Sequence, residues 1–431
     1  MRRSICIISF SPIYQDARVL RQIKYLSPQY DLVVIGYGHP HTDFAKIPSI
    51  KWMSLDSSEG LNNRTNSLIR RNSLRQFVVN SHQGAKIIEL LRFLMAKIRL
   101  VIYYLVMFLG RLNSSVYESW YWRNVRHLQA LEYATSSRCD AFHANDWNAL
   151  PVAAEAAGRA SGQLVFDAHE YAPLELENRR FWKLLFKPVI TYFIQKYSNQ
   201  IKASLTVAPL ISERYKKEFG LDPVILLNAP ASMLIPNREL DFNNIRMIHH
   251  GGAIRDRQLE KMIKILALCD QRYSLHFMLI NNGSEYLKHL KKLANELAPG
   301  RVTFLEPVLP EEVVQRISEY DMGFCLIAPT NYNYLVSLPN KFFDYIMAGL
   351  AVCIGPSPSM AELVRKYGLG CVAPSFEPQD VAKTLNQLTL DQLLMMRQAS
   401  KEAAKKINAE NEMGKLIELY SRLFSSEFYA Q

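Results

Sequence analysis

The stretch from Ser337 to Gly349 contains residues that suit the binding of a phosphorylated ligand. Its sequence is Ser-Leu-Pro-Asn-Lys-Phe-Phe-Asp-Tyr-Ile-Met-Ala-Gly. Asn340 follows a proline and opens a predicted helix, whose first backbone N–H groups lack intrahelical partners. Lys341 adds a charge at the positive end of the helix dipole, and such an end binds anions. Asp344 lies one turn further along the helix, where its carboxylate can accept hydrogen bonds from ribose hydroxyl groups. The pattern favours a nucleotide diphosphate; the alternative is an ordinary capped helix of an α/β protein.

A second candidate anion site follows the predicted strand 247–250. Gly251 and Gly252 allow backbone amides to approach an oxyanion, and the Arg257 guanidinium lies where it can pair with a diphosphate. The alternative is a surface turn between a strand and a helix. The chain has no G-x-G-x-x-G followed by a ribose-binding acid and no Walker A loop, which argues against a dehydrogenase or a nucleoside triphosphatase.

Polar residues also follow two short apolar runs in the first half of the chain. Asn145 comes after the first run, and His169 and Glu170 come after the second. A carboxylate in a partly desolvated cleft gains basicity, so Glu170 is a candidate general base for an acceptor hydroxyl. The alternative is that His169 and the nearby Asp167 only satisfy amides of the loop.

The elements around these motifs predict a parallel, doubly wound α/β architecture, because apolar strand-like runs alternate with helical patterns. Strands are expected at 5–10, 32–36, 141–143, 164–168, 204–208, 247–250, 274–280, 302–306, 322–327, 351–354 and 371–372. Helices are expected at 16–26, 150–161, 178–198, 209–219, 258–269, 286–297, 310–319, 340–348, 360–367 and from 378 onward.

Two domains are expected, because a chain of 431 residues is longer than a domain with a single hydrophobic core usually is. The proline-rich passage 228–237 is the best linker candidate, which divides the chain into an N-terminal domain at 1–228 and a C-terminal domain at 229–409. Two such domains place a ligand cleft at the carboxyl ends of both sheets.

Basic residues gather in one segment of the chain. The chain carries a formal net charge of +11, and residues 61–126 contain 11 Lys or Arg against two Glu, a net of +9. Within this segment, a helix at 85–110 would have charged residues on one face and aliphatic residues on the other, which is typical of binding to an anionic membrane surface. The alternative is an internal helix packed on the first sheet. Nucleic acid is disfavoured, because aliphatic side chains rather than stacking aromatics line the segment.

Cysteine spacing and the N-terminal residues both favour a cytoplasmic protein. The six cysteines are scattered without a C-x-x-C pair, so buried reduced thiols are expected. The apolar run at 5–10 is only as long as a strand, which favours a core strand over a signal peptide. Because neither Asp-x-Asp nor a His/Cys cluster with metal spacing occurs, we expect no bound metal and no cofactor apart from the nucleotide diphosphate ligand.

These motifs, in this order, resemble the family 4 glycosyltransferases, which have the GT-B fold of two Rossmann-like domains. Asp344 matches the second acid of the family's Glu-x7-Glu pair, whereas the first acid falls at Val336. Arg257 matches a cation that follows a glycine, and Asn145 replaces the second histidine of a His-x-His motif that faces the donor sugar. The resemblance implies transfer of a sugar from a nucleotide diphosphate with retention of anomeric configuration.

The same resemblance implies further donor contacts. Asn282 and Gly283 correspond to a turn beside the nucleotide base, and Pro307 and Val308 correspond to a segment that reads the base edge. Residues 410–431 correspond to a terminal helix that crosses back to the N-terminal domain. The donor base, UDP or GDP, stays open.

The expected function is a metal-independent glycosyltransferase that acts on a lipid-linked or growing glycan in cell-surface polysaccharide synthesis, at the inner face of the cytoplasmic membrane. A GT-B-fold nucleotide-sugar epimerase is one alternative, and the basic segment 85–110 argues against it. A non-catalytic scaffold subunit is the other, which Val336 and Asn145 support. Lys341, Asp344 and Arg257 argue instead for intact donor binding.

Overall fold

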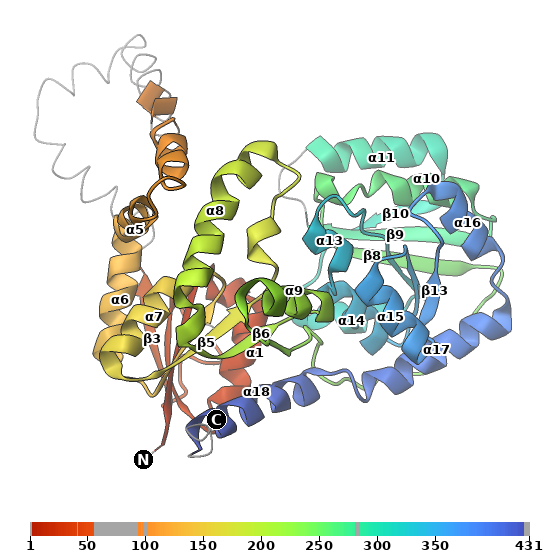
Figure 1. Ribbon diagram of the computed structural model, residues 1–431. Coiled ribbons are helices and arrows are strands. Elements are labelled where there is room, and N and C mark those ends of the chain that lie inside the picture. Colours follow the sequence, from red (N-terminus) through yellow and green to blue (C-terminus); the bar gives the residue numbers. More distant parts are fainter. Residues whose placement is uncertain are drawn as a thin grey trace, which may run out of the picture. The chain divides into compact units, whose positions relative to one another are not determined.

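The chain forms two α/β units, each with its own parallel sheet (Figure 1). The computed structural model describes residues 2–40, 42–55, 94–95, 97–98, 101–280 and 285–425. The first unit comprises Met1–Leu205, Tyr215–Pro223 and Arg422–Gln431, and the second comprises Thr206–Arg214 and Val224–Ser421. The second unit therefore takes up the chain slightly before the boundary expected at residue 228.

The first sheet has seven strands in the order β3-β2-β1-β4-β5-β6-β7. Their bounds are Ser4–Pro12 (β1), Asp31–Tyr37 (β2), Ile50–Leu55 (β3), Ala141–Asn145 (β4), Gln163–Ala168 (β5), Ile201–Thr206 (β6) and Val224–Ile225 (β7). The chain winds outward from β1 to β3 and then returns to pair β4 with β1, so the strand order reverses between β1 and β4. Ligands of such sheets bind outside the carboxyl ends of the strands at this reversal.

Helices connect these strands at Ala17–Leu26 (α1), Ser115–Trp122 (α5), Val125–Ser137 (α6), Leu150–Ala160 (α7), Arg180–Tyr197 (α8) and Pro209–Phe219 (α9). The Asp16 side chain caps α1 by accepting hydrogen bonds from the backbone amides of Arg18 and Val19. This carboxylate satisfies two amides that the first turn leaves without partners.

The second sheet has six strands in the order β10-β9-β8-β11-β12-β13, and its order reverses between β8 and β11. The strands are Ile245–Gly252 (β8), Tyr273–Ile280 (β9), Val302–Leu305 (β10), Met322–Cys325 (β11), Ala351–Ile354 (β12) and Gly370–Val372 (β13). The helices are Glu260–Leu268 (α10), Glu285–Leu297 (α11), Val313–Ile317 (α12), Tyr332–Val336 (α13), Asn340–Met347 (α14), Pro358–Tyr367 (α15), Pro378–Asn386 (α16), Leu390–Ala404 (α17) and Ala409–Phe424 (α18).

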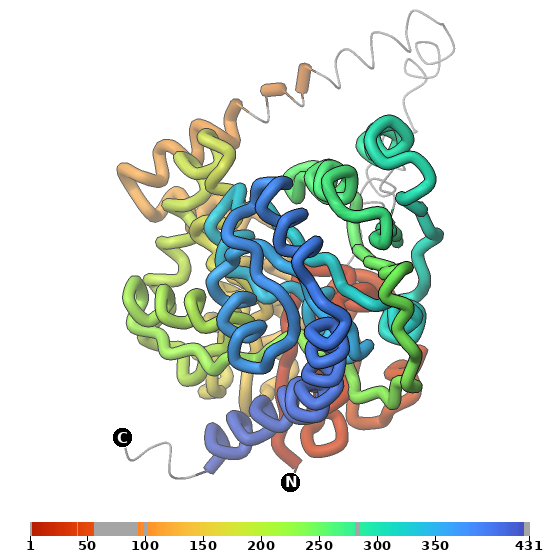
Figure 2. Tube along the Cα trace, turned by 90° about the vertical axis from the view of Figure 1, so that its right-hand side faces the viewer, coloured from red at the N-terminus to blue at the C-terminus, as the bar shows by residue number. Residues whose placement is uncertain are grey.

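The last helix, α18, joins both units along the chain, as the resemblance implied. It begins in the second unit, where the Glu412 carboxylate accepts a hydrogen bond of 2.9 Å from the backbone amide of Leu227. Its last residues belong to the first unit, where the ring of Phe424 lies 5.7 Å from that of Tyr30. Figure 2 shows this end of the blue helix close to the red N-terminal strand.

The sequence did not predict five of these helices and strands, which are α5, α6, α13, β3 and β7. Residues 331–334, for which no helix was predicted, contain the start of α13. The Asn331 side chain caps that helix by accepting a hydrogen bond of 2.8 Å from the amide of Tyr334. Strand β3 was not predicted, since its mixed polar and apolar residues match an edge strand that is only partly buried. Val336 is buried in α13, so a valine there serves packing.

The predicted helix 85–110 lies partly outside the described residues. Positions 94–95, 97–98 and 101–109 are helical. No helix within the described part of the chain is both long and apolar enough to cross a membrane.

Helix α14 is held tightly against the second sheet. Tyr345 is fully buried, and its ring packs on the backbone of Gly323 in β11. A Cβ added at Gly323 would lie 2.1 Å from the Tyr345 ring, well inside van der Waals contact. The absence of a side chain at this position therefore sets how closely α14 approaches β11.

Replacing Gly323 with Ala should lower the free energy of unfolding by about 1–3 kcal/mol, because the new methyl group forces Tyr345 or the backbone to move. Denaturant unfolding monitored by circular dichroism measures the change. Gly414→Ala in α18 is the matched control, since no atom lies within 4 Å of the added Cβ. The control should stabilise the helix by about 0.5–1 kcal/mol. A Gly323→Ala protein as stable as the wild type would contradict this packing.

Candidate functional site

Lys341, near the start of α14, is buried next to His249 of β8. The Lys341 Nζ lies 3.1 Å from the Nε2 of His249. The Nδ1 of His249 lies 2.8 Å from the backbone carbonyl of Phe324, which can only accept, so Nδ1 carries the proton. Burial, together with the Lys341 charge, holds the pKa of His249 well below its usual value. The neutral ring therefore presents the Nε2 lone pair to the Lys341 ammonium.

Lys341 and Arg257 approach the backbone of Gly251 at the end of β8. Gly251 has a φ of +116°, a conformation that favours glycine. The point where a Cβ would stand is 3.4 Å from the Lys341 Nζ and 3.8 Å from an Arg257 terminal nitrogen. The Nε of Arg257 is buried and has no hydrogen-bond partner among the residues that the structure describes. Two cations and a side-chain-free backbone thus meet at one place, which suits a diphosphate.

The buried position of Lys341 makes its charge sensitive to a ligand. Burial, with a further contribution from the Arg257 charge, lowers the pKa of Lys341 to about 7, and the Asp344 carboxylate only partly opposes this. A bound anion would favour the ammonium form and raise this pKa again. The site is therefore only partly charged at neutral pH and would gain charge when an anion binds.

Asp344 lies one turn further along α14, next to His250 of β8. Its Oδ2 is 3.4 Å from the Nε2 of His250. Burial, followed by the charges of Lys341 and Arg257, lowers the pKa of His250 to about 3, so the ring is neutral. This places a partly buried carboxylate near the two cations, where it could accept from the hydroxyl groups of a ribose.

The other predicted donor residues are placed around this centre or outside the described residues. Gly252 ends β8, and Asn340 is the first residue of α14. Pro307 and Val308 follow β10, the edge strand separated from β8 by β9. Asn282 and Gly283 lie outside the described residues. The described part of the chain contains no group of three or more His, Cys, Asp or Glu arranged to hold a metal ion.

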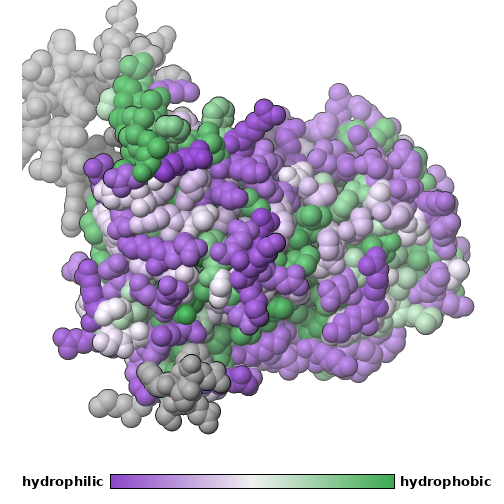
Figure 3. Space-filling model, in the orientation of Figure 1, coloured by the Kyte–Doolittle hydropathy of each residue, from purple (hydrophilic) through white to green (hydrophobic). Residues whose placement is uncertain are grey.

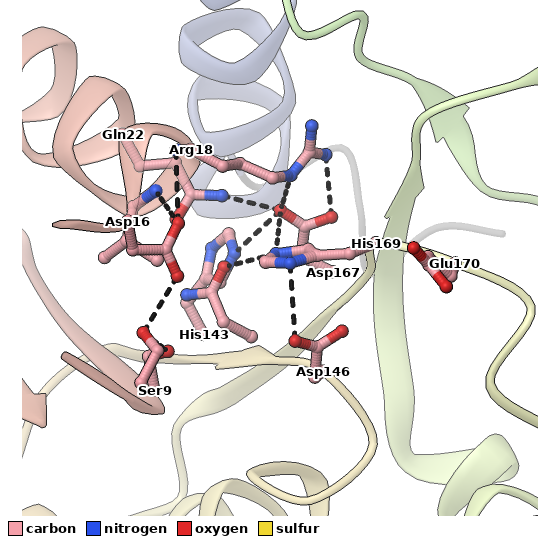
Figure 4. Close-up of polar contacts among 12 residues, drawn as sticks. Ser9, Asp16, Arg18, Gln22, His143, Asp146, Asp167, His169 and Glu170 are labelled. Carbon is pink, nitrogen blue, oxygen red and sulfur yellow. Dashed lines mark hydrogen bonds and ion pairs between the residues drawn. The ribbon is translucent and has the colours of Figure 1, made fainter. Parts of the chain in front are cut away.

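A buried network of polar side chains lies at the carboxyl ends of β4 and β5 in the first unit (Figure 4). At its centre, Asp167 accepts two hydrogen bonds from the Arg18 guanidinium, each 2.7 Å long, and a third from Gln22 at 2.6 Å. Burial opposes the charge of Asp167, but the charge of Arg18 and the hydrogen bonds outweigh it, so the pKa of Asp167 is lowered. The network ties α1 to β5 through an ionised carboxylate.

His169 is brought together with Asn145 and also with Asp146. Its Nε2 lies 3.1 Å from the Asn145 side-chain oxygen, and its Nδ1 lies 3.3 Å from the Asp146 carboxylate. Asp146 has a φ of +65°, an unusual conformation for a residue with a side chain, which turns the chain sharply after β4. Glu170 is exposed and lies apart from this network in Figure 4.

Sequence reasoning missed Arg18 and Gln22. Both lie on the buried face of α1, at positions that share the helical spacing of Val19, Ile23 and Leu26. Polar residues within an otherwise apolar stripe require buried partners. That pattern was visible in the sequence, although the partner, Asp167, is 149 residues away from Arg18.

Comparison with solved structures shows the fold. HepE from Anabaena, in a crystal structure with UDP and glucose, has a TM-score of 0.64 and 15% identity over 97% of this chain and 100% of its own. Sucrose-phosphate synthase from Thermosynechococcus elongatus has a TM-score of 0.66 and 12% identity over 98% and 99%. An α,α-trehalose-phosphate synthase (UDP-forming) from Burkholderia vietnamiensis has a TM-score of 0.61 and 7% identity over 98% and 99%. No family model and no curated protein matches the chain.

The two parallel sheets of seven and six strands, together with these neighbours, show that the chain has the GT-B fold. The predicted fold class is therefore confirmed.

Lys341→Ala should weaken binding of a nucleoside diphosphate at least tenfold while changing nucleoside binding little, because one charge-assisted contact contributes about 1.5–3 kcal/mol. Asp344→Ala should weaken both, since the ribose is common to both ligands. Calorimetry with UDP, GDP and the matching nucleosides measures these affinities. Lys366→Ala on the exposed face of α15 is the control and should bind like the wild type. Equal diphosphate affinity for Lys341→Ala and wild type would rule out this lysine as a phosphate ligand.

Diphosphate affinity should fall as the pH rises above 7. Lys341 has a pKa of about 7 in the free protein, and a bound anion raises it, so only the protonated lysine favours binding. Between these two pKa values the affinity should drop by up to about tenfold per pH unit. Lys341→Arg should bind without this dependence, because arginine stays charged. A wild-type affinity that is constant from pH 7 to 9 would contradict the assignment.

Proposed function

We propose that the chain is a glycosyltransferase that uses a nucleotide diphosphate sugar as donor. The observation that carries this proposal is the approach of Lys341 and Arg257 to Gly251, with the Asp344 carboxylate one turn further along α14. The fold supports it, since HepE, one of its structural neighbours, has a crystal structure in complex with UDP-glucose. In this arrangement the diphosphate lies against the two cations and the ribose hydroxyls reach Asp344.

The protein would catalyse transfer mainly by stabilising the leaving nucleoside diphosphate. Charge develops on the diphosphate as the bond to the sugar breaks, and preorganised cations lower the free energy of that state. Lys341 and Arg257 supply two positive charges, so we propose that neither a metal nor a separate cofactor is needed. Retention of anomeric configuration is part of the proposal and rests on the resemblance to family 4.

His169 and Glu170 are the proposed residues of the acceptor side, and the Asn145 amide is the proposed contact to the donor sugar. His169 is half-buried, and its ring is fixed between Asn145 and Asp146. Glu170 follows it directly and is exposed, where an incoming hydroxyl group can reach its carboxylate. A carboxylate or an imidazole within hydrogen-bond distance of that hydroxyl can remove its proton.

The proposed acceptor is a lipid-linked or growing glycan in the synthesis of a cell-surface polysaccharide such as lipopolysaccharide, capsule or exopolysaccharide. The proposed location is the inner face of the cytoplasmic membrane, with the segment 85–110 bound to anionic lipid. The net charge of +9 in residues 61–126 supports this location, because anionic leaflets attract basic segments.

Nucleotide-sugar turnover should survive excess EDTA with at most a modest loss of rate, because the protein's own cations replace a metal. A thermal-shift screen of UDP- and GDP-sugars identifies the donor, and release of the nucleoside diphosphate measures turnover. An enzyme silenced by EDTA and revived by Mn²⁺ or Mg²⁺ would show that the diphosphate is held by a metal instead. If no nucleotide sugar stabilises the protein, the transferase proposal itself is wrong.

A further inference from the structure

The helical segment around 101–109 exposes a stripe of large apolar side chains. Val101, Leu105 and Phe108 follow the spacing of one helix face, and Leu112 is exposed in the turn after the helix. Leu94 and Ile98 are exposed helical residues earlier in the segment. Val101 is 65% exposed and Leu112 is 79% exposed. Figure 3 shows a green, apolar area at the upper left, where the segment 101–109 lies in Figure 1. An apolar face of this length on the surface of a protein marks a binding surface.

The first half of α8 continues this apolar surface. Phe181 is 75% exposed and Leu184 is 46% exposed. The two helices are in contact, because the ring centroids of Tyr103 and Phe186 are 5.3 Å apart. Figures 1 and 2 show the segment 101–109 and α8 side by side in both views. The two exposed faces therefore belong to one surface.

A groove of about 960 Å³ lies along α8 and is lined by both apolar and basic side chains. Its apolar lining includes Leu184, Pro188 and Tyr192. Its basic lining residues are Arg111, Arg180, Lys183, Lys187 and Lys196. Lys183 and Lys196 are paired, with Glu177 at 3.6 Å and Glu118 at 3.0 Å. Within the described part of the chain, Arg111, Arg180 and Lys187 make no ion pair. These three cations can therefore bind anions from outside the protein.

We propose that residues 101–112 and the first half of α8, Arg180–Lys187, form one docking surface for an anionic lipid bilayer. The apolar side chains enter the boundary between headgroups and acyl chains, and Arg111, Arg180 and Lys187 pair with lipid phosphates. This inference rests on the membrane location in the proposed function and adds α8 and its groove, which the sequence did not indicate.

The charge of the surface favours a bilayer over a second copy of the chain. In a symmetric dimer the same patch meets itself, so the unpaired cations of both copies would come together and repel each other. An anionic leaflet instead presents phosphates to the cations and apolar chains to the stripe. The occupant that satisfies both features is a lipid surface of negative charge.

Sedimentation with lipid vesicles tests this inference on the full chain. Wild-type protein should bind vesicles that contain phosphatidylglycerol, bind pure phosphatidylcholine vesicles at least tenfold less, and dissociate from the anionic vesicles at high salt. Arg180→Gln/Lys187→Gln and Phe181→Ser/Leu184→Ser should each lower the partition coefficient at least tenfold. Exposed residues of the second unit supply the matched controls, Lys264→Gln/Lys288→Gln and Leu394→Ser/Met395→Ser, which should bind like the wild type.

Each α8 variant should keep the wild-type melting temperature and nucleoside diphosphate affinity, which separates lost docking from misfolding and from the donor site. If the wild type binds anionic vesicles and both α8 variants bind equally well, α8 is not part of the surface. If the wild type ignores these vesicles, membrane docking is wrong, and nucleotide binding by the same preparation tests the transferase proposal separately. A wild-type dimer that the α8 variants convert to monomers, measured by light scattering, would show that a second copy covers the surface.

Discussion

Parallel pairing of the strands is the constraint on which both candidate sites depend. In a parallel sheet the carboxyl ends of neighbouring strands meet at one edge, and the chain must turn there before each returning helix. In the first unit, β4 and β5 end with Asn145 paired in register to Asp167. In the second unit, β8 ends with the two glycines beside α14. Residues far apart in the chain are thereby collected at the points where each strand order reverses.

Each unit contains a buried ionisable side chain at its candidate site, but the two side chains have opposite surroundings. Asp167 is neutralised within the protein, by the paired contacts of Arg18 and the additional hydrogen bond of Gln22. These contacts fix α1 on the sheet, and removal of one partner leaves an uncompensated buried charge. Lys341, in contrast, is buried against a neutral histidine and near another cation, and its pKa falls accordingly. The first arrangement suits a structural role, whereas the second is improved by an incoming anion.

In the second unit, packing and hydrogen bonds hold α14 and His249, which position Lys341. Helix α14 is fixed by the Tyr345 ring on Gly323, and the His249 tautomer is fixed by the carbonyl of Phe324. Lys341 therefore cannot move far from Gly251 without breaking packing that also stabilises the sheet. A cation held in place before the ligand arrives loses little conformational entropy on binding, which favours tight and specific recognition of phosphate.

The sequence by itself determined most strands and helices, because apolar periodicity, helix caps and prolines act over a few residues. It also determined the spacing of Asn340, Lys341 and Asp344, since one helix carries all three. It did not reveal the edge strand β3 or the short helix α13, whose patterns are weak, nor that Glu170 lies apart from the network around His169. Only the tertiary structure decided that Arg18 pairs with Asp167 and that Arg257 and Lys341 meet at Gly251. Those contacts join segments that are distant in the chain, and local propensity contains no information about which distant partner a buried charge will meet.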